Sequence, residues 1–456
     1  MGNSMKVIIV GAGELGRLLA YTLCAENHDV VIVDSSLDGL ERLTDKLDIM
    51  TVEGSCASVA TLKSAGAESA DVLLAVSGDE AANILSCQIA SKLGVRHTLC
   101  RLYSSDAFSE KDGITPDSFG IWRTFSPPEE CVRKILDVFD NEIILEKIRF
   151  SSPDALMAVF EITPSSLLAG LRIKDIPGSD LIATVRFAAI LRSKQFLIPH
   201  GDTILVPGDK IYLAGHRDNV QAFIRWITPD SLPKRKRVII TGAGDAGKML
   251  ARKAASMGND VVFIEKELKK GEELLDELPS GILLIHGDAT DEETLEEAGI
   301  SSCDIFVSAA QDDEENILSA IIAKRLGARK VVTLTYKPEY IKIVPALDLI
   351  DSGFSATLIS VNTILRLLES GMMRIDAILQ QFNAHLTEFR ISERSPLCGK
   401  RLPEAGIPSS VVFALIFRGS QVITPSGHTV FHAGDTIVAI VTSESEKELK
   451  PLFPEK

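Results

Sequence analysis

The sequence carries one glycine-rich turn twice, at two places where backbone amides could hold a phosphate. The first copy reads VIIVGAGELG from Val7 and the second reads VIITGAGDAG from Val238. Each is a complete G-x-G-x-x-G between an apolar run and a helical pattern. The first glycine of such a turn makes the bend, the second lets a pyrophosphate approach the backbone, and the third lets the helix pack on the strand. The amides at the helix start then face the phosphates.

An acidic residue closes the next apolar run in each copy. Asp34 and Glu265 each lie 23 residues beyond the first glycine of their turn (34 − 11 and 265 − 242). A carboxylate there accepts both ribose hydroxyls and repels a 2′-phosphate, so NAD is favoured over NADP. Glu14 and Asp245 lie inside the turns, and neither turn has a Walker-type Lys-Ser/Thr. Both features disfavour a triphosphate with a metal.

Other candidate residues lie at the ends of later strands. Arg101, near the end of the fifth strand, could neutralise phosphate in the first copy. Leu334 (101 + 233) occupies the equivalent place in the second copy, which therefore lacks this charge. Ser55 and Asp288 follow the third strand, where Asp288 could accept a hydrogen bond from an adenine amino group and Ser55 could do so weakly. A helix N-cap is the alternative for both.

Polar loops follow the fourth strand of each copy and end in Asn83 and Asn316. These loops could line a cleft at the topological switch point, or could be solvated caps. The full set of predicted nucleotide-binding residues is Gly11, Gly13, Glu14, Leu15, Gly16, Asp34, Ser55, Val76, Ser77 and Arg101 in the first copy, and Gly242, Gly244, Asp245, Ala246, Gly247, Glu265, Asp288, Ala289 and Ala309 in the second.

The repeat extends well beyond the turns. Residues 6–34 match 237–265, and residues 54–94 match 287–327. A period this long indicates duplication of a whole domain. Within each copy, short Val/Ile/Leu runs alternate with helical patterns, which predicts an α/β fold with a doubly wound, Rossmann-like parallel sheet.

A second repeat follows each of these domains. PHGDTILVPGDKI at 199–211 matches PSGHTVFHAGDTI at 425–437. Its short β-branched segments between Gly-Asp or Pro turns predict a small α+β module with an antiparallel sheet. We therefore expect Rossmann-like domains at 5–140 and 237–380, small modules at 141–228 and 381–456, and a linker at 229–236.

Composition narrows the function. The formal net charge is −15, so nucleic acid is not an expected partner. The sequence has no secretory signal pattern and no apolar run of about 18 residues, the length that a membrane span requires. Seven scattered cysteines without a C-x-x-C pair argue against a zinc site and a disulfide framework, and the cytosol fits best.

The sequence contains no recognisable catalytic set. Its eight histidines do not recur at equivalent positions of the two halves, and no H-E-x-x-H or G-x-S-x-G is present. A dehydrogenase needs an acid or base beside the nicotinamide, and none can be located. We therefore expect a sensor with no catalytic residues, in which nucleotide shifts the arrangement of domains. An NAD-dependent oxidoreductase with a duplicated cofactor domain is the alternative.

The order of these segments resembles that of the TrkA family, the peripheral NAD-binding subunits of bacterial Trk potassium uptake systems. Such chains carry two RCK (regulator of K⁺ conductance) units in tandem. The matching segments include KVIIVGAGELG, RVIITGAGDAG, GDATDEETLEEAGI, PHGDTILVPGD and PSGHTVFHAGD. The resemblance covers nearly the whole chain.

This resemblance implies a cytoplasmic regulator on the inner face of the cell membrane. Such subunits usually form tetrameric rings against a potassium transporter of the TrkH or TrkG type. NAD(H), or ATP and ADP in some relatives, binds the Rossmann clefts and changes ion flux. ATP-binding relatives with a single unit often have an arginine in the glycine turn, where this chain has Glu14 and Asp245, so NAD(H) is the first choice.

Two amphipathic stretches follow the Rossmann-like domains, at 129–140 and 361–379. Helices there could cross between units and bury an apolar stripe at an assembly interface. Ordinary packing within the chain is the alternative.

Overall fold

Two parallel sheets with the same strand order carry the two glycine turns. In the computed structural model the order is β3-β2-β1-β4-β5-β6 in the first sheet and β14-β13-β12-β15-β16-β17 in the second. The order reverses between β1 and β4 and between β12 and β15, so both sheets are doubly wound. The predicted α/β fold class with Rossmann-like sheets is confirmed.

The structure describes the chain except residues 1–3, 26, 38, 41–48, 105–106, 140–142, 151, 194, 229–234, 338, 341–348, 370–376, 379–383, 409–410, 443–447 and 454–456. Most of the predicted linker at 229–236 therefore lies outside the described residues.

The elements of the Rossmann-like domains follow the predicted alternation of strand and helix. Those of the first are β1 (Lys6–Val10), α1 (Glu14–Ala25), β2 (Asp29–Asp34), β3 (Met50–Glu53), α3 (Val59–Ser64), β4 (Val72–Ala75), α4 (Glu80–Leu93), β5 (His97–Arg101), β6 (Arg123–Phe125) and α5 (Pro127–Asp137). Those of the second are β12 (Arg237–Thr241), α8 (Asp245–Ser256), β13 (Asp260–Glu265), α9 (Leu268–Glu277), β14 (Leu283–His286), α10 (Glu292–Glu297), β15 (Ile305–Ser308), α11 (Asp313–Arg325), β16 (Lys330–Thr335), β17 (Ser352–Ser355) and α13 (Ala356–Glu369).

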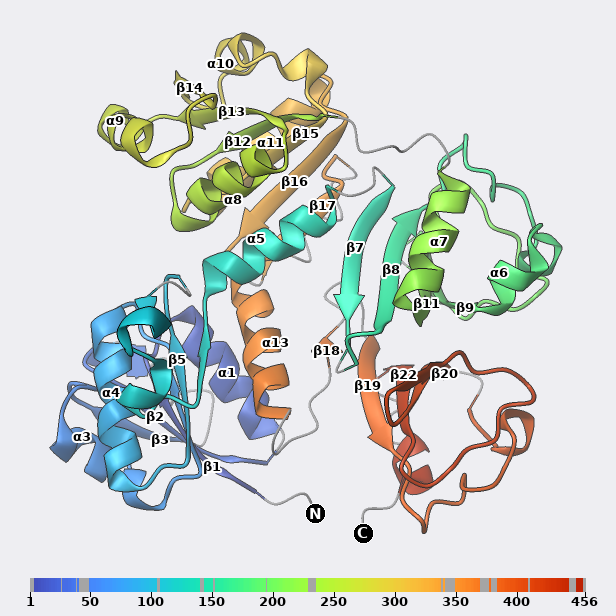
Figure 1. Ribbon diagram of the computed structural model, residues 1–456, viewed down its shortest axis with the longest axis horizontal. Helices are drawn as coiled ribbons and strands as arrows, with labels where there is room; N and C mark the ends of the chain where they lie inside the picture. The colour runs from blue at the N-terminus through green and yellow to red at the C-terminus, as the bar shows by residue number, and fades with distance from the viewer. Residues whose placement is uncertain are drawn as a thin grey trace. The chain divides into compact units, whose positions relative to one another are not determined.

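Strands β1, β2 and β4 are apolar on both faces because helices cover both sides of the sheet. Ile8 and Val10 belong to a buried cluster that also holds residues of α3 and α4. Val7 and Ile9, which point the other way, are also fully buried. Figure 1 shows α1 and α4 on opposite sides of this sheet.

The segments after the parallel sheets form small antiparallel modules, as predicted. Their strand orders are β10-β9-β11-β8-β7 and β18-β19-β22-β20-β21. The elements of the first are β7 (Ile144–Arg149), β8 (Ala155–Glu161), α6 (Ser179–Ala183), β9 (Val185–Arg192), β10 (Gln195–Leu197), β11 (Lys210–His216) and α7 (Arg217–Ile227). Those of the second are β18 (Ala377–Ile378), β19 (Ala384–Arg390), β20 (Val412–Arg418), β21 (Gln421–Ile423) and β22 (Thr436–Thr442).

One ion pair with a buried carboxylate recurs in both modules. Asp209 is fully buried, and its carboxylate accepts hydrogen bonds from Arg192 Nε and Nη2, both at 2.7 Å, and from the Val206 amide at 2.9 Å. Arg418 and Asp435 repeat the arrangement at 2.8 Å. The repeated Pro-Gly-Asp and Ala-Gly-Asp turns thus place an aspartate that ties the turn to a neighbouring strand.

The chain divides into two compact units, each of which contains the like parts of both halves. Met1–Arg133 and Arg237–Leu368 form one unit, and Lys134–Lys236 and Glu369–Lys456 form the other. In the second unit, one buried cluster includes Met157 and Ala188 of the first module together with Ala414 and Val438 of the second. The two small modules therefore share a core.

The Rossmann-like domains also contact each other within their unit. Thr363 of α13 donates a hydrogen bond to the Glu130 carboxylate of α5 at 3.0 Å. Ile135 and Phe139, on the apolar stripe predicted for 129–140, are buried within one chain.

The stretch predicted at 361–379 is only partly helical. Helix α13 ends at Glu369, and Ala377–Ile378 form strand β18. Residues 370–376 lie outside the described part of the chain. The short β18 pairs with β19, and this pairing takes the place of further helix.

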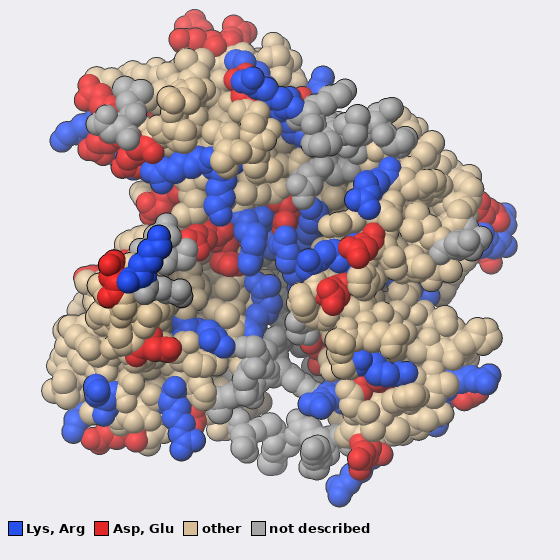
Figure 2. Space-filling view, viewed as in Figure 1, with Lys and Arg blue, Asp and Glu red and all other residues tan. Residues whose placement is uncertain are grey.

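Acidic side chains are concentrated on α10. All four of its glutamates are exposed, and they form the red patch at the top of Figure 2.

We expect Asp209→Ala to lower the free energy of unfolding of the first module by about 2 kcal/mol, because charged hydrogen bonds to a buried acceptor are lost. Urea unfolding followed by Trp226 fluorescence measures this, since Trp226 packs on Phe223 in that module with ring centroids 5.6 Å apart. Asp202→Ala is the control, because Asp202 is 76% exposed. Equal midpoints for the two variants would contradict the assignment.

Candidate nucleotide-binding clefts

The first and third glycines of each turn are required by the packing of the chain itself. Gly11 and Gly242 have φ of +106° and +98°, a region that side chains rarely adopt. A Cβ on Gly16 would lie 1.8 Å from the Gly11 carbonyl oxygen, and one on Gly247 would lie 2.1 Å from the Gly242 oxygen. Only glycine lets the helix approach the strand so closely.

The second glycine of each turn faces open space instead. A Cβ on Gly13 would meet nothing within 4 Å, and one on Gly244 would find only the Ala309 carbonyl oxygen at 3.6 Å. The fold would therefore accept a side chain at either position. A side chain there would, however, block a phosphate that must reach the backbone. This space fits the cradle that a pyrophosphate needs.

The predicted ribose carboxylates brace the glycine turns. Asp34 Oδ2 accepts the Ala12 amide at 2.6 Å, and Oδ1 accepts the Ser36 amide at 2.8 Å. Glu265 repeats this with the amides of Ala243 at 2.7 Å and Glu267 at 2.9 Å. Each carboxylate thus holds the turn beside the end of the second strand. An oxygen with two lone pairs can accept a ribose hydroxyl as well.

The other predicted residues of the turns differ in which of their groups a ligand could reach. Leu15 and Ala246 are buried, so only their backbone amides can face a ligand. Glu14 and Asp245 are the first residues of helices α1 and α8, where the positive end of the helix dipole stabilises a carboxylate. Glu14 also pairs with Arg17.

The residues after the third strands form turns and do not cap helices. Asp288 Oδ1 accepts the Thr290 amide at 2.8 Å and the Thr290 hydroxyl at 2.7 Å. These bonds lower the pKa of the Asp288 carboxyl. Ser55 Oγ accepts the Ala57 amide at 3.3 Å. The N-cap alternative is wrong, because Ser58 and Asp291 occupy the N-cap positions of α3 and α10.

Asn83 and Asn316 are buried side chains that crosslink backbone segments, and they neither line a cleft nor form solvated caps. Both are at most 1% exposed. Asn83 Oδ1 accepts the Ser77 amide at 3.0 Å while Nδ2 donates to the Arg101 carbonyl at 3.2 Å. Asn316 makes the same bonds to Ala310 and to the Leu334 carbonyl. Each asparagine ties the loop after the fourth strand to the end of the fifth.

Arg101 lies near the predicted first cleft and is influenced by the second copy. Its Nη1 is 3.4 Å from the carbonyl oxygens of both Val76 and Ser77. Burial lowers the pKa of the guanidinium, and the negative charge of Asp245 acts against that shift. Asp245 belongs to the second glycine turn, so this cation lies where the two copies meet.

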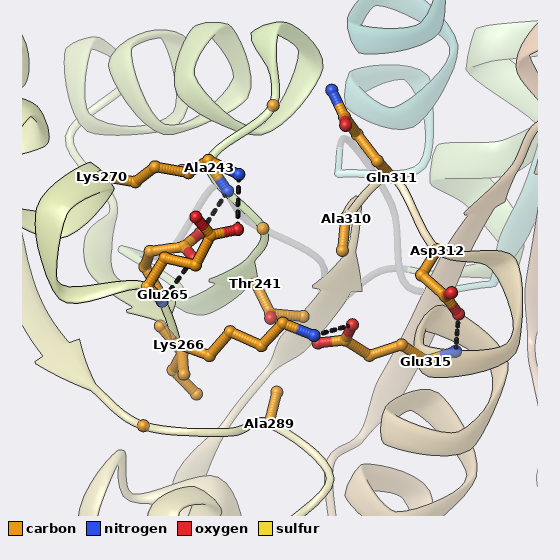
Figure 3. A pocket seen from close by; sticks show the side chains of 15 residues that line it. Thr241, Ala243, Glu265, Lys266, Lys270, Ala289, Ala310, Gln311, Asp312 and Glu315 are labelled. Carbon is orange, nitrogen blue, oxygen red and sulfur yellow. Dashed lines mark hydrogen bonds and ion pairs between the residues drawn. The ribbon is translucent and has the colours of Figure 1, made fainter.

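The second turn opens on a hollow of about 230 Å³. Its lining includes Gly242, Gly244, Glu265 and Ala289, which the sequence predicted, whereas Ala309 is wholly buried. The polar loop after the fourth strand of the second copy, which the sequence suggested as a cleft wall, supplies Ala310, Gln311, Asp312 and Glu315 to this lining. Sequence reasoning missed five further lining residues: Thr241, Ala243, Lys266, Glu267 and Lys270. Figure 3 shows Lys266 reaching toward Glu315 across this hollow. A comparison of the two copies shows that Ser35 and Ala82 replace these two residues in the first copy, but it gives no signal that they pair.

Within the described residues, no group of three or more His, Cys, Asp or Glu side chains could hold a metal ion. No helix in the same parts of the chain has the length and apolar character needed to cross a membrane.

Known proteins match both the domains and their order. The TrkA-N domain model matches residues 7–111 and 238–352, and the TrkA-C domain model matches 157–228 and 386–453. A Trk system potassium uptake protein TrkA homolog of Archaeoglobus fulgidus is 29% identical and covers 98% of this chain and 100% of the relative. The Trk system potassium uptake protein TrkA of Halomonas elongata is 28% identical, with 98% of each chain covered.

Solved structures share the fold. The GsuK RCK domain aligns with a TM-score of 0.63 at 18% identity, over 98% of this chain and 94% of that one. The GsuK channel bound to NAD aligns with a TM-score of 0.62 at 17% identity, over 99% of this chain and 79% of that one. GsuK bound to ADP aligns with a TM-score of 0.52 at 14% identity, over 81% and 70%.

Two doubly wound domains with interleaved antiparallel modules define a tandem RCK-type fold. The matched domains and their order place the chain in one family of this class. It belongs to the family of Trk system potassium uptake proteins of the TrkA type. This family consists of potassium uptake system proteins and not of enzymes, which confirms the expectation that the chain is not an enzyme.

We expect Gly16→Ala to destabilise the first Rossmann-like domain by about 1–3 kcal/mol, the usual cost of overpacking, because its Cβ would overlap the Gly11 carbonyl. Gly13→Ala should leave stability nearly unchanged, since its Cβ meets nothing. Thermal unfolding of the two variants measures the difference. Equal losses would show that the space in front of Gly13 is not open.

Proposed function

We propose that this chain is a nucleotide-sensing regulatory subunit of a potassium uptake system, and that NAD(H) is the nucleotide. The observation that carries the proposal is the open space in front of Gly13 and Gly244, each beside a braced carboxylate. A turn shaped only by its own packing does not need glycine at that second position. A turn that admits a pyrophosphate does.

The choice of ligand rests on the carboxylates. Asp34 and Glu265 can accept ribose hydroxyls and disfavour a 2′-phosphate, which supports NAD(H) over NADP(H). A structural neighbour is the GsuK channel bound to NAD, and another is GsuK bound to ADP. ATP or ADP is therefore the second candidate ligand.

The partner in this proposal is a membrane potassium transporter of the TrkH or TrkG type. The chain would act as a homo-oligomeric ring, a tetramer, in the cytoplasm on the inner face of the cell membrane. Nucleotide would bind two arrangements of the ring with different affinity and so shift ion flux. The names of the relatives support a role in potassium uptake.

We expect isothermal titration of the full chain with NADH, NAD, ADP and ATP to show saturable binding. Gly13→Val and Gly244→Val should each remove one site, because the new side chain fills the space for the phosphate while leaving the turn folded. Gly427→Val is the matched control, since its Cβ meets only Pro403 at 3.9 Å in the second small module. Binding that survives both cleft substitutions would refute these sites.

We expect nucleotide sensing to reach potassium flux. In cells that contain a TrkH-type transporter and lack their own TrkA-type protein, expression of this chain should change potassium uptake. The double variant Gly13→Val, Gly244→Val should be produced at the same level but give flux that no longer follows the nucleotide pool. If the double variant and the unmodified chain give identical flux, the sensing role is wrong.

A further inference from the structure

An ion pair bridges the second cleft. Lys266 Nζ lies 2.5 Å from Glu315 Oε2, and both residues line the hollow at the second glycine turn. The Lys266 side chain is 47% exposed and that of Glu315 is 16% exposed, so the pair lies at the rim of the cleft. Figure 3 shows the bridge in front of Thr241, the last residue of β12.

The bridge crosses the place where the strand order reverses. Lys266 follows β13, and Glu315 lies in the first turn of α11, which follows β15. Strand β12 lies between β13 and β15 in the sheet. In open α/β sheets a nucleotide lies in the crevice at this switch point. The ion pair therefore spans the crevice that the ligand must enter.

The first cleft has no such bridge. Ser35 follows Asp34 as Lys266 follows Glu265, and Ala82 precedes Asn83 as Glu315 precedes Asn316. The backbone confirms the register, because the Ala82 amide donates to Asp79 and the Glu315 amide donates to Asp312 in the same way. Short, uncharged side chains thus stand where the second copy has the ion pair.

The surroundings favour a charged Lys266. The hydrogen bond that Lys266 Nζ donates to the Glu315 carboxylate is the largest cause that raises the pKa of the Lys266 ammonium, and the charges of Asp288 and Asp312 act in the same direction. The Lys266 carbonyl is held by His286 Nε2 at 3.0 Å, so the backbone at the root of the side chain is also tied to β14.

We infer that Lys266 and Glu315 form a latch that a nucleotide must open to enter the second cleft, so that the second cleft binds adenine nucleotides more weakly than the first. This inference rests on the proposed function, because it concerns the same clefts. The latch is a second difference between the clefts, beside the Arg101 charge that the second copy lacks, while the glycine cradle is shared.

The latch is a modest barrier. A partly exposed ion pair changes an equilibrium by up to about fivefold. It is also screened by salt, whose Debye length falls to about 3 Å at 1 M. The affinity gap between the two clefts should therefore narrow as KCl is raised, and NaCl should have the same effect.

The test isolates one cleft at a time. With Gly13→Val in the background, NADH and ADP are titrated into the full chain with and without Glu315→Gln or Lys266→Met. Each rim substitution should tighten binding about three- to fivefold, because no bridge remains to be opened. Glu314→Gln is the control, since this neighbouring glutamate pairs with Lys337 and not with Lys266.

The reciprocal experiment builds a latch in the first cleft. With Gly244→Val in the background, the double substitution Ser35→Lys, Ala82→Glu should weaken nucleotide binding by a similar factor. The loss of affinity relative to the background should become smaller at high KCl. Either single substitution should have a smaller effect. A double variant that binds as the background does would overturn the inference.

Failure of the latch is distinguishable from failure of the proposed function. If the unmodified chain binds neither nucleotide, both fall together. If it binds and Glu315→Gln leaves the second cleft unchanged, only the latch is wrong. If Glu315→Gln tightens binding but Lys266→Met weakens it, Lys266 contacts the nucleotide and the latch is again wrong.

Discussion

The candidate site depends on the close contact between the first and third glycines of each turn. At Gly16 and Gly247 the helix backbone lies against a carbonyl oxygen so closely that no side chain fits between them. This contact places the first turn of α1 or α8 directly over the end of β1 or β12. Because the first amides of a helix have no acceptor within it, they are directed at the crevice. The carboxylates of Asp34 and Glu265 then tie each glycine turn to the end of the second strand.

The duplication determines how the chain packs, because equivalent domains of the two halves pack together. The two Rossmann-like domains fall in one compact unit and the two small modules in the other. The charge of Asp245 in the second glycine turn opposes the lowering of the Arg101 pKa by burial, so charged groups of the two copies lie near each other in this unit.

The fold was readable from the sequence because the signals were local and repeated. Short apolar runs and complete glycine turns predicted the parallel sheets, and the two copies gave the same prediction independently.

The rim of the cleft could not be predicted in the same way. Lys266 and Glu315 are 49 residues apart, and only the doubly wound order of the sheet brings them together. The burial of Asn83 and Asn316 was not predicted, because a polar residue in a loop after a strand is usually exposed. Here each side-chain amide instead satisfies backbone groups inside the protein. The end of α13 was missed because an amphipathic pattern continued into β18.

A duplicated domain can keep its fold as a relic after it has lost its ligand. The second copy has Leu334 where the first has Arg101, but this difference alone does not show that its cleft is such a relic. Gly247 and Asn316 would be retained in a relic as well, because the packing of the domain needs them. Gly244 is different, since a side chain there would make only an ordinary contact with the Ala309 carbonyl. Its open space, beside a carboxylate that braces the turn as Asp34 does, fits a ligand and not a packing need. The copies differ beside this shared cradle: the first has Arg101 at the end of β5, and the second has the Lys266–Glu315 pair across its hollow.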